Sequence, residues 1–222
     1  MEYTRIISVE EPLFTAMHEL MQRVFPPEEV LDAALWAPVF EDDTIRVCAA
    51  VHEGEVVGVT EYRYNPTHRV AMTDFTIISK PGLGIGRFLY RNRQKDLLVM
   101  AGGEANLLGM FAEIYDPYRH NVHTFGDLPL MSPVVRREVL SHLGYMRLDL
   151  TYVHPSWEND GEAVEGLDFC FLPTDESLTE LSAALVAAFL QEYYAVLPNK
   201  PQAWLDMIEQ ISKQPTIRLL PI

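Results

Sequence analysis

The chain has few cysteines. Only two occur among its 222 residues, Cys48 and Cys170, and each lies in an apolar, strand-like run without a second cysteine or a histidine at metal-ligand spacing. We therefore predict two buried, reduced thiols and no cysteine-based metal site. A chain of this length also buries enough apolar surface to fold without covalent cross-links.

Long apolar runs are missing as well. No window approaches the roughly 18 to 20 apolar residues of a membrane-spanning helix, and the opening residues MEYTRIISVEE contain no basic stretch followed by an apolar core. We therefore expect a cytoplasmic protein that has no membrane partner. The hydrophobic fraction of 48% is ordinary for a globular protein and excludes a disordered or fibrous chain.

Basic residues are outnumbered by acidic ones, 17 to 32, which gives a formal net charge of −15. Such a surface repels phosphates at long range, so nucleic acid is not an expected partner, and a cationic ligand is weakly favoured. One segment is different. Residues 80–95, called here the basic segment, contain five basic residues and no acidic one: Lys80, Arg87, Arg91, Arg93 and Lys95.

Apolar periodicity and turn residues divide the chain into alternating elements. Strands are predicted at 4–9, 45–51, 56–64, 70–78, 107–114, 145–153, 167–172 and 216–220, and helices at 13–24, 28–36, 88–101, 132–143, 174–197 and 201–211. The strands between 45 and 78 are joined by short polar turns, which predicts an antiparallel meander. Residues 116–131 show no periodicity and are predicted to form a long surface loop.

The chain shows no repeat, low-complexity tract or flexible linker. We therefore expect residues 174–222 to form a helical extension packed on the same domain as residues 1–173. The predicted fold class is α/β.

A glycine-rich turn follows the predicted strand at 70–78. Gly82, Gly84 and Gly86 stand just before a helix, where glycines let the main chain approach an anion and the helix N-terminus presents free N–H groups to a phosphate. A dinucleotide-binding fold would need a third glycine where Arg87 stands, and its strands would belong to a parallel βαβ unit. A dehydrogenase-type nucleotide binder is thus a third hypothesis, which the sheet topology tests.

Residues 75–89, FTIISKPGLGIGRFL, closely resemble the acetyl-CoA loop of the Gcn5-related N-acetyltransferase (GNAT) superfamily, R/Q-x-x-G-x-G/A, which also follows a fourth strand. Residues 138–145, EVLSHLGY, are similar to a later helix of that family that ends in a Gly-aromatic pair. The resemblance covers roughly residues 4–172. It implies a mixed, mainly antiparallel central sheet flanked by helices.

The resemblance also implies an N-acyltransferase that moves an acetyl or other short acyl group from acetyl-CoA, or another acyl-CoA, to an amine by direct attack. The main chain of Ile77 and Ser79 would then pair with the pantetheine arm, and the amides of residues 82–87 would bind the pyrophosphate. The expected cofactor-binding residues are Ile77, Ile78, Ser79, Gly82, Leu83, Gly84, Ile85, Gly86 and Arg87.

Two residues depart from the family pattern. Pro81 occupies the usual Arg/Gln position of the loop, and Leu140 stands where many family members carry a tyrosine that is thought to protonate the leaving thiolate. These departures keep an alternative open, in which the protein is a catalytically silent acyl-CoA-binding sensor or a protein-interaction module of the same fold.

Attack on a thioester needs a neutral amine, so a carboxylate or histidine must accept a proton. The candidates are Asp74, which stands where family members often carry an acidic residue, Glu61 on the preceding strand, and Glu113 at the end of a later strand. His120 and His123 have no third ligand at a convincing spacing, and no metal is expected. The acceptor is expected to be a small amine, with a cationic one slightly favoured; a protein amino group and a homodimeric assembly stay open.

Overall fold

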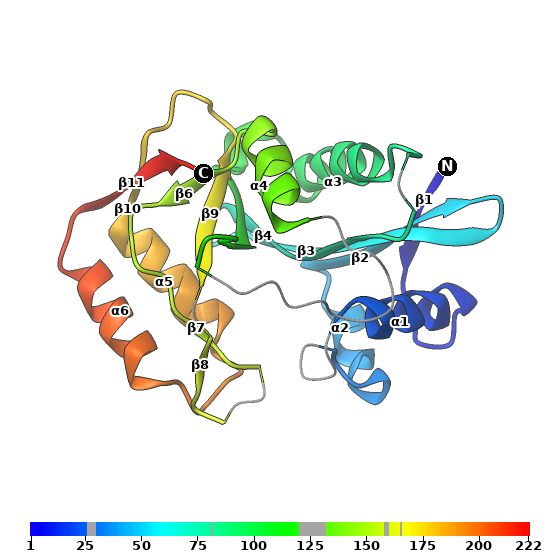
Figure 1. Ribbon diagram of the computed structural model, residues 1–222, viewed down its shortest axis with the longest axis horizontal. Helices are drawn as coiled ribbons and strands as arrows, with labels where there is room; N and C mark the ends of the chain where they lie inside the picture. Colours follow the sequence, from blue (N-terminus) through cyan, green and yellow to red (C-terminus); the bar gives the residue numbers. More distant parts are fainter. Residues whose placement is uncertain (26–29, 81, 120–131, 158–159, 165) are drawn as a thin grey trace. The chain divides into compact units, whose positions relative to one another are not determined.

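The computed structural model describes residues 1–25, 30–80, 82–119, 132–157, 160–164 and 166–222, and the chain divides into two compact units (Figure 1). The N-terminal unit comprises the described residues up to Leu108, and the C-terminal unit those from Gly109 onward. Within the described residues no helix combines the length and the apolar character that crossing a membrane requires.

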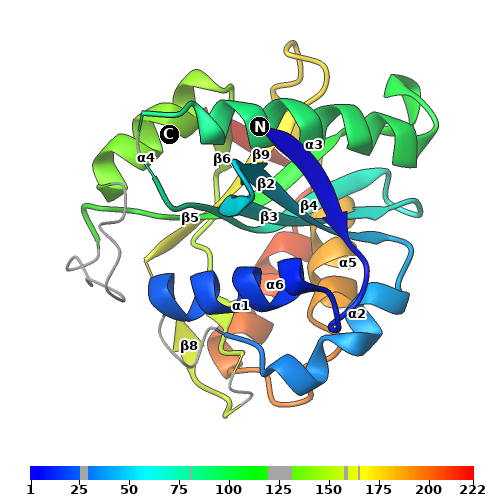
Figure 2. The same cartoon turned by 90° about the vertical axis from the view of Figure 1, so that its right-hand side faces the viewer.

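The N-terminal unit is built on four antiparallel strands in the order β1-β2-β3-β4. Their bounds are β1 (Glu2–Ile6), β2 (Ile45–His52), β3 (Glu55–Asn65) and β4 (Val70–Ile78). The helices are α1 (Pro12–Val24), α2 (Ala37–Glu41) and α3 (Ile85–Ala101), with short 3-10 turns at Ala33–Leu35 and Glu104–Asn106. Figures 1 and 2 show α3 over one face of these strands and α1 over the other.

Alternation along β3 explains how the two faces are covered. Val59 is fully buried in an apolar cluster with Met17 and Leu20 of α1, so from Val59 onward the odd-numbered residues of the strand face α1. Gly58 faces α3, because a Cβ added there would lie only 2.6 Å from Cγ2 of Ile85. Glu61 therefore lies on the α1 face of the sheet.

The C-terminal unit has its own antiparallel strands in the order β5-β9-β6-β11-β10. They are β5 (Gly109–Tyr115), β9 (Leu167–Pro173), β6 (Met146–Leu148), β11 (Thr216–Pro221) and β10 (Glu180–Ser182), and a separate pair is formed by β7 (His154–Pro155) and β8 (Ala163–Val164). The helices are α4 (Pro133–His142), α5 (Ala183–Tyr193) and α6 (Gln202–Ser212). Phe111 of β5 stacks on Phe169 of β9 and on Phe189 of α5, with ring centroids 4.7 and 4.8 Å apart, and these rings form the centre of the core.

The predicted fold class, α/β with mainly antiparallel strands flanked by helices, is confirmed. Every strand pairing given above within the two units is antiparallel, which contradicts the hypothesis of a dehydrogenase-type nucleotide binder with a parallel sheet. After residue 173 the chain forms strands as well as helices, and β11 pairs with β6. The boundary expected at residue 173 stays a prediction.

Three predicted elements were wrong in extent. The helix expected at 28–36 is replaced, where the structure describes it, by a 3-10 turn that Asp32 caps through the amide of Ala34, with α2 starting only at Ala37. The strand expected at 145–153 ends at Leu148, because the amide of Leu150 turns back to the carbonyl of that residue. The helix expected at 174–197 begins only at Ala183, after the short strand β10.

Candidate functional site

The turn between β4 and α3 depends on the backbone freedom of glycine. Gly82 and Gly84 have φ angles of 85° and 68°, in the left-handed region that side chains with a Cβ rarely adopt. A Cβ at either position would meet no atom within 4 Å, so the conformation rather than lack of space requires glycine. Both residues are exposed. The main chain at Gly82 and Gly84 is therefore open to solvent, with the exposed side chain of Leu83 between them.

This turn leads into an uncapped helix N-terminus. Gly84 is the N-cap of α3, its carbonyl accepts from the amide of Phe88 at 3.0 Å, and no described side chain caps the helix. Helix geometry leaves the amides of Ile85, Gly86 and Arg87 without intrahelical acceptors. These donors, together with the positive end of the helix dipole, can bind an anionic group such as a diphosphate.

Close packing holds the start of α3 against the end of β4. A Cβ on Gly86 would lie 2.9 Å from Cδ1 of Ile78, and a Cβ on Gly58 would lie 2.9 Å from the carbonyl oxygen of Ile77. The carbonyl oxygen of Ile77 belongs to the main chain, so glycine is required at position 58, whereas the contact at Gly86 is with the far end of a side chain that can shift. The glycine turn and the last residues of β4 are thus held at a defined separation.

The direction of the main chain at the end of β4 does not fit the predicted pairing of Ile77 and Ser79 with the pantetheine arm. The amide of Ser79 donates to the carbonyl of Val57 at 2.9 Å, and its hydroxyl donates to the same oxygen at 2.8 Å. Because main-chain groups alternate along a strand, Ile77, which is opposite Val59, also faces β3. Ile78 faces the other edge of the strand. The main chain of Ile78, rather than that of Ile77 and Ser79, therefore has the direction needed to pair with a ligand.

The basic segment does not present all its cations to solvent. Arg93 is buried, and its Nη1 donates to the hydroxyls of three threonines on β3 and β4 at 2.9 to 3.1 Å. Lys80 pairs with Glu55. The other three cations are exposed and four residues apart on α3, which places them along one side of the helix: Arg87, Arg91 and Lys95.

Two of the predicted catalytic carboxyls meet on the α1 face of the sheet. The register shifts between Glu61 and Tyr62, so Asp74 is an extra residue in β4 and turns toward the same face as Glu61. Arg63 donates to Oδ2 of Asp74 from Nε and Nη2 at 3.3 and 3.2 Å, and its Nη2 lies 3.8 Å from Oε1 of Glu61. The three side chains form one acid–acid–guanidinium cluster.

Burial raises the pKa of Glu61 well above its usual range, and the charge of Asp74 raises it further, while Arg63 opposes the shift. Only 7% of Glu61 is exposed, so its charged form is poorly solvated. Burial and the neighbouring Asp74 carboxyl thus both disfavour the charged form of Glu61. A carboxyl whose pKa is raised in this way accepts a proton more readily than a solvated one.

The third predicted carboxyl, Glu113, belongs to a different cluster in the C-terminal unit. The hydroxyls of Tyr152 and Tyr194 both donate to its Oε1, and their two oxygens are 2.9 Å apart. Nε2 of His154 lies 3.7 Å from Oε2. Burial, and then the charge of Glu113, raise the pKa of both phenols far above the ordinary value, so both stay protonated as donors.

The partners of Glu113 were not predicted. Tyr152 lies in the strand predicted at 145–153 and Tyr194 in the helix predicted at 174–197, and no spacing in the sequence connects residues so far apart. Tyr145 is buried, and Leu140 is half-buried in α4. Pro81, His120 and His123 lie outside the described residues.

Comparison with known proteins supports the fold. No protein-family model and no curated protein sequence matches the chain. Among solved structures, a protein from Bacteroides thetaiotaomicron described as a GNAT-family acetyltransferase superposes with a TM-score of 0.60 at 12% identity, covering 90% of this chain and 98% of that chain. An aminoglycoside 6'-N-acetyltransferase solved with coenzyme A gives a TM-score of 0.53 at 16% identity, covering 79% and 98%.

A spermidine N-acetyltransferase chimera that includes Vibrio cholerae sequence also gives a TM-score of 0.53, at 12% identity and with 78% and 96% coverage. Identities of this size show the fold alone. The chain has the GNAT fold, and the resemblance drawn from the glycine segment is confirmed at that level.

Proposed function

We propose that this protein is an acyl-CoA-dependent N-acyltransferase that transfers an acetyl or other short acyl group to an amine. The observation that carries the proposal is the left-handed Gly82–Gly84 turn, which leads into an uncapped helix N-terminus within a GNAT fold. Coenzyme A carries a diphosphate, and free amides at the start of a helix are suited to bind it. A neighbour of the same fold was solved with coenzyme A, which supports this choice of ligand.

In this proposal the amides of residues 82–87 hold the diphosphate of the acyl donor. The outward-facing main chain of Ile78 pairs with the pantetheine arm, in the manner of an added strand. Arg87 and Arg91 are exposed near the start of α3 and add attraction for a polyanionic ligand. Arg93 has no part in this contact, because it is buried on its three threonines.

The chemical step needs little from the protein beyond alignment and proton transfer. The amine nitrogen forms a bond to the thioester carbonyl carbon, the carbon–sulfur bond breaks, and the thiolate of coenzyme A receives a proton. We assign removal of the amine proton to Glu61 of the Glu61–Asp74 pair, because its raised pKa makes it a better proton acceptor than a solvated carboxylate. Arg63 keeps the remaining negative charge of the pair stabilised.

Glu113 is a weaker candidate for the base. Two phenol donors already occupy its Oε1, so that oxygen is not available to an amine. We therefore propose that Glu113 is a positioning residue, which holds the side chains of Tyr152 and Tyr194 in place.

The acceptor proposed is a small amine, with a cationic one favoured. The net charge of −15 attracts cations at long range, and the names of two proteins of the same fold specify an aminoglycoside and spermidine as substrates. Neither name identifies the acceptor of this chain.

The proposal is tested in two steps. Thermal unfolding is first measured with acetyl-CoA, succinyl-CoA and longer acyl-CoAs, and a rise in the melting temperature is expected for at least one of them. Release of free thiol is then followed with the best donor against a panel of amines that includes spermidine and an aminoglycoside. Absence of stabilisation by every acyl-CoA would refute the proposal.

The absence of a tyrosine from α4 favours a second function. Leu140 occupies the position at which many GNAT proteins carry a tyrosine, and none of the other residues of Pro133–His142 is a tyrosine. The same fold would then bind acyl-CoA as a silent sensor or interaction module. Stabilisation by acyl-CoA without thiol release from any amine is the result that distinguishes this function from catalysis.

A further inference from the structure

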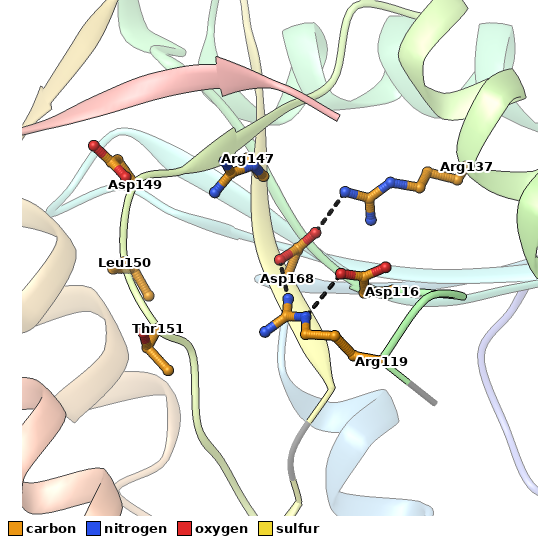
Figure 3. A pocket seen from close by; sticks show the side chains of 8 residues that line it. All are labelled: Asp116, Arg119, Arg137, Arg147, Asp149, Leu150, Thr151 and Asp168. Atoms are coloured by element: carbon orange, nitrogen blue, oxygen red, sulfur yellow. Dashed lines mark hydrogen bonds and ion pairs between the residues drawn. The ribbon is translucent and has the colours of Figure 1, made fainter. Parts of the chain in front are cut away.

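The C-terminal unit contains a charged cavity of about 500 Å³, a size typical of small-molecule sites (Figure 3). Six of its eight lining residues carry charge: Asp116, Arg119, Arg137, Arg147, Asp149 and Asp168. None of them belongs to the glycine turn or to the Glu61–Asp74 pair. The cavity is therefore lined by residues that have no part in the proposed transferase site.

Two of the carboxylates in the cavity are neutralised by two arginines. Asp168 is buried and accepts from Arg119 at Oδ1, while Nη2 of Arg137 lies 2.7 Å from its Oδ2. Nε of Arg119 also donates to Oδ2 of Asp116 at 2.7 Å. Figure 3 shows this chain of contacts along one side of the cavity. These four side chains hold one another in place and contribute no net charge.

The third carboxylate is neutralised from outside the cavity lining. Oδ2 of Asp149 accepts from Nη2 and Nε of Arg218 on β11, at 2.5 and 3.2 Å. This leaves Arg147 of β6, for which no described carboxylate lies within ion-pair distance. In Figure 3 its side chain lies between Asp149 and Asp168 with no interaction drawn. Among the residues that the structure describes, one guanidinium charge in the cavity is therefore uncompensated.

A second donor in the cavity lining is also unused. Nη1 of Arg137 is buried and has no hydrogen-bond partner among the described residues, although Nη2 of the same group contacts Asp168. A buried donor without a partner is unfavourable, so a ligand oxygen that accepts from it gains free energy. A guanidinium matches the paired oxygens of a carboxylate or a phosphate, because its donors form a planar fork.

We propose that this cavity binds a small oxyanion, a carboxylate or a phosphate group, with Arg147 as the main anchor and Nη1 of Arg137 as a second donor. The surrounding carboxylates are all paired, so they shape the site without cancelling the charge of Arg147. The acidic surface of the chain repels anions at long range, which means that affinity for the oxyanion comes from these local contacts.

The test is a calorimetric titration of the full chain, without any CoA, using inorganic phosphate in one arm and succinate in the other at constant ionic strength. Omitting CoA keeps the result independent of the proposed transferase function. Binding is expected in at least one arm, and Arg147→Gln should weaken it about tenfold or more, since a hydrogen-bonded charge pair is lost. The arm that binds identifies the oxyanion as phosphate or carboxylate.

Lys213→Gln is the matched control, because it removes the same charge from an exposed position on the C-terminal side of α6, where Lys213 pairs only with Glu209. This variant should bind within about twofold of the wild type. Arg147→Lys keeps the charge but loses the fork, and an intermediate affinity is expected from it even if the glutamine variant does not fold. The proposal is overturned if neither oxyanion binds the wild type, or if the Arg147 variants bind as tightly as the Lys213 control.

Discussion

Replacing Gly84 by alanine tests whether the glycine turn binds the acyl donor. A Cβ at this position meets no atom within 4 Å, so the cost to folding is the left-handed conformation alone, about 1 kcal/mol. For a chain of this length such a loss lowers the melting temperature by about 2 to 4 °C. The added methyl group would also stand beside the free amides of α3, where the diphosphate is expected to lie.

Gly102 provides a matched control at the other end of the same helix. Its φ of 70° is nearly that of Gly84 at 68°, and the nearest atom to an added Cβ is 3.9 Å away. Gly102→Ala should therefore lose about the same stability, close to 1 kcal/mol, with no effect on ligand binding.

The two variants are compared by titration with acetyl-CoA. Loss of one or two charge-assisted hydrogen bonds, each worth about 1.5 to 3 kcal/mol, predicts at least a tenfold weaker Kd for Gly84→Ala. Gly102→Ala should stay within about twofold of the wild type. If both variants bind acetyl-CoA equally well, the amides at the start of α3 do not hold the diphosphate, and the proposed binding mode fails.

Three further predictions concern buried acids and their partners. Glu61→Gln should lower thiol release at saturating acetyl-CoA about 100-fold, since a proton acceptor is lost. Thermal stabilisation by acetyl-CoA should persist in this variant. Asp43→Asn, which changes an exposed acid, is the control and should leave the rate of thiol release unchanged. Because the pKa of Glu61 is raised on folding, its contribution to stability is full below the unfolded value of about 4.5 and is lost as the pH rises through the folded value. Urea unfolding of the wild type should therefore show a decline in stability over that interval that Glu61→Gln reduces, and identical pH profiles would contradict the assigned shift. Tyr194→Phe should cost about 1 to 3 kcal/mol in urea unfolding, since it removes a buried donor to Glu113, whereas Tyr118→Phe, at an exposed ring, should cost less than about 0.5 kcal/mol.

The acid–acid–guanidinium cluster and the Glu113 cluster use carboxyls in opposite ways. Glu61 has a raised pKa because burial and Asp74 disfavour its charge. Glu113 instead accepts from two phenols, which occupy its Oε1. The proposed base therefore lies on β3 and β4, where the raised pKa of Glu61 favours proton acceptance.

Local sequence determined the elements around the glycine turn. The strand predicted at 70–78 agrees with β4, and the helix that follows ends at the predicted Gly102. These features depend on residues close in the chain: β-branched runs, polar turns, and glycines that adopt the left-handed conformation at both ends of α3. The GNAT resemblance was visible for the same reason, since its central motif occupies one continuous segment.

Tertiary structure alone decided which chemical groups meet. A bulge in β4 turns Asp74 toward Glu61, and a one-residue change in register there would separate them. Arg93 is buried, although a count of basic residues in the sequence would place its charge on the surface. The two phenols that donate to Glu113 are 39 and 81 residues away in the chain, and the cavity around Arg147 draws its charges from α4, β6 and β9 and from the residues that follow β5 and β6. Such contacts depend on which strands pair and which helix faces cover them, and no local pattern in the sequence encodes that pairing.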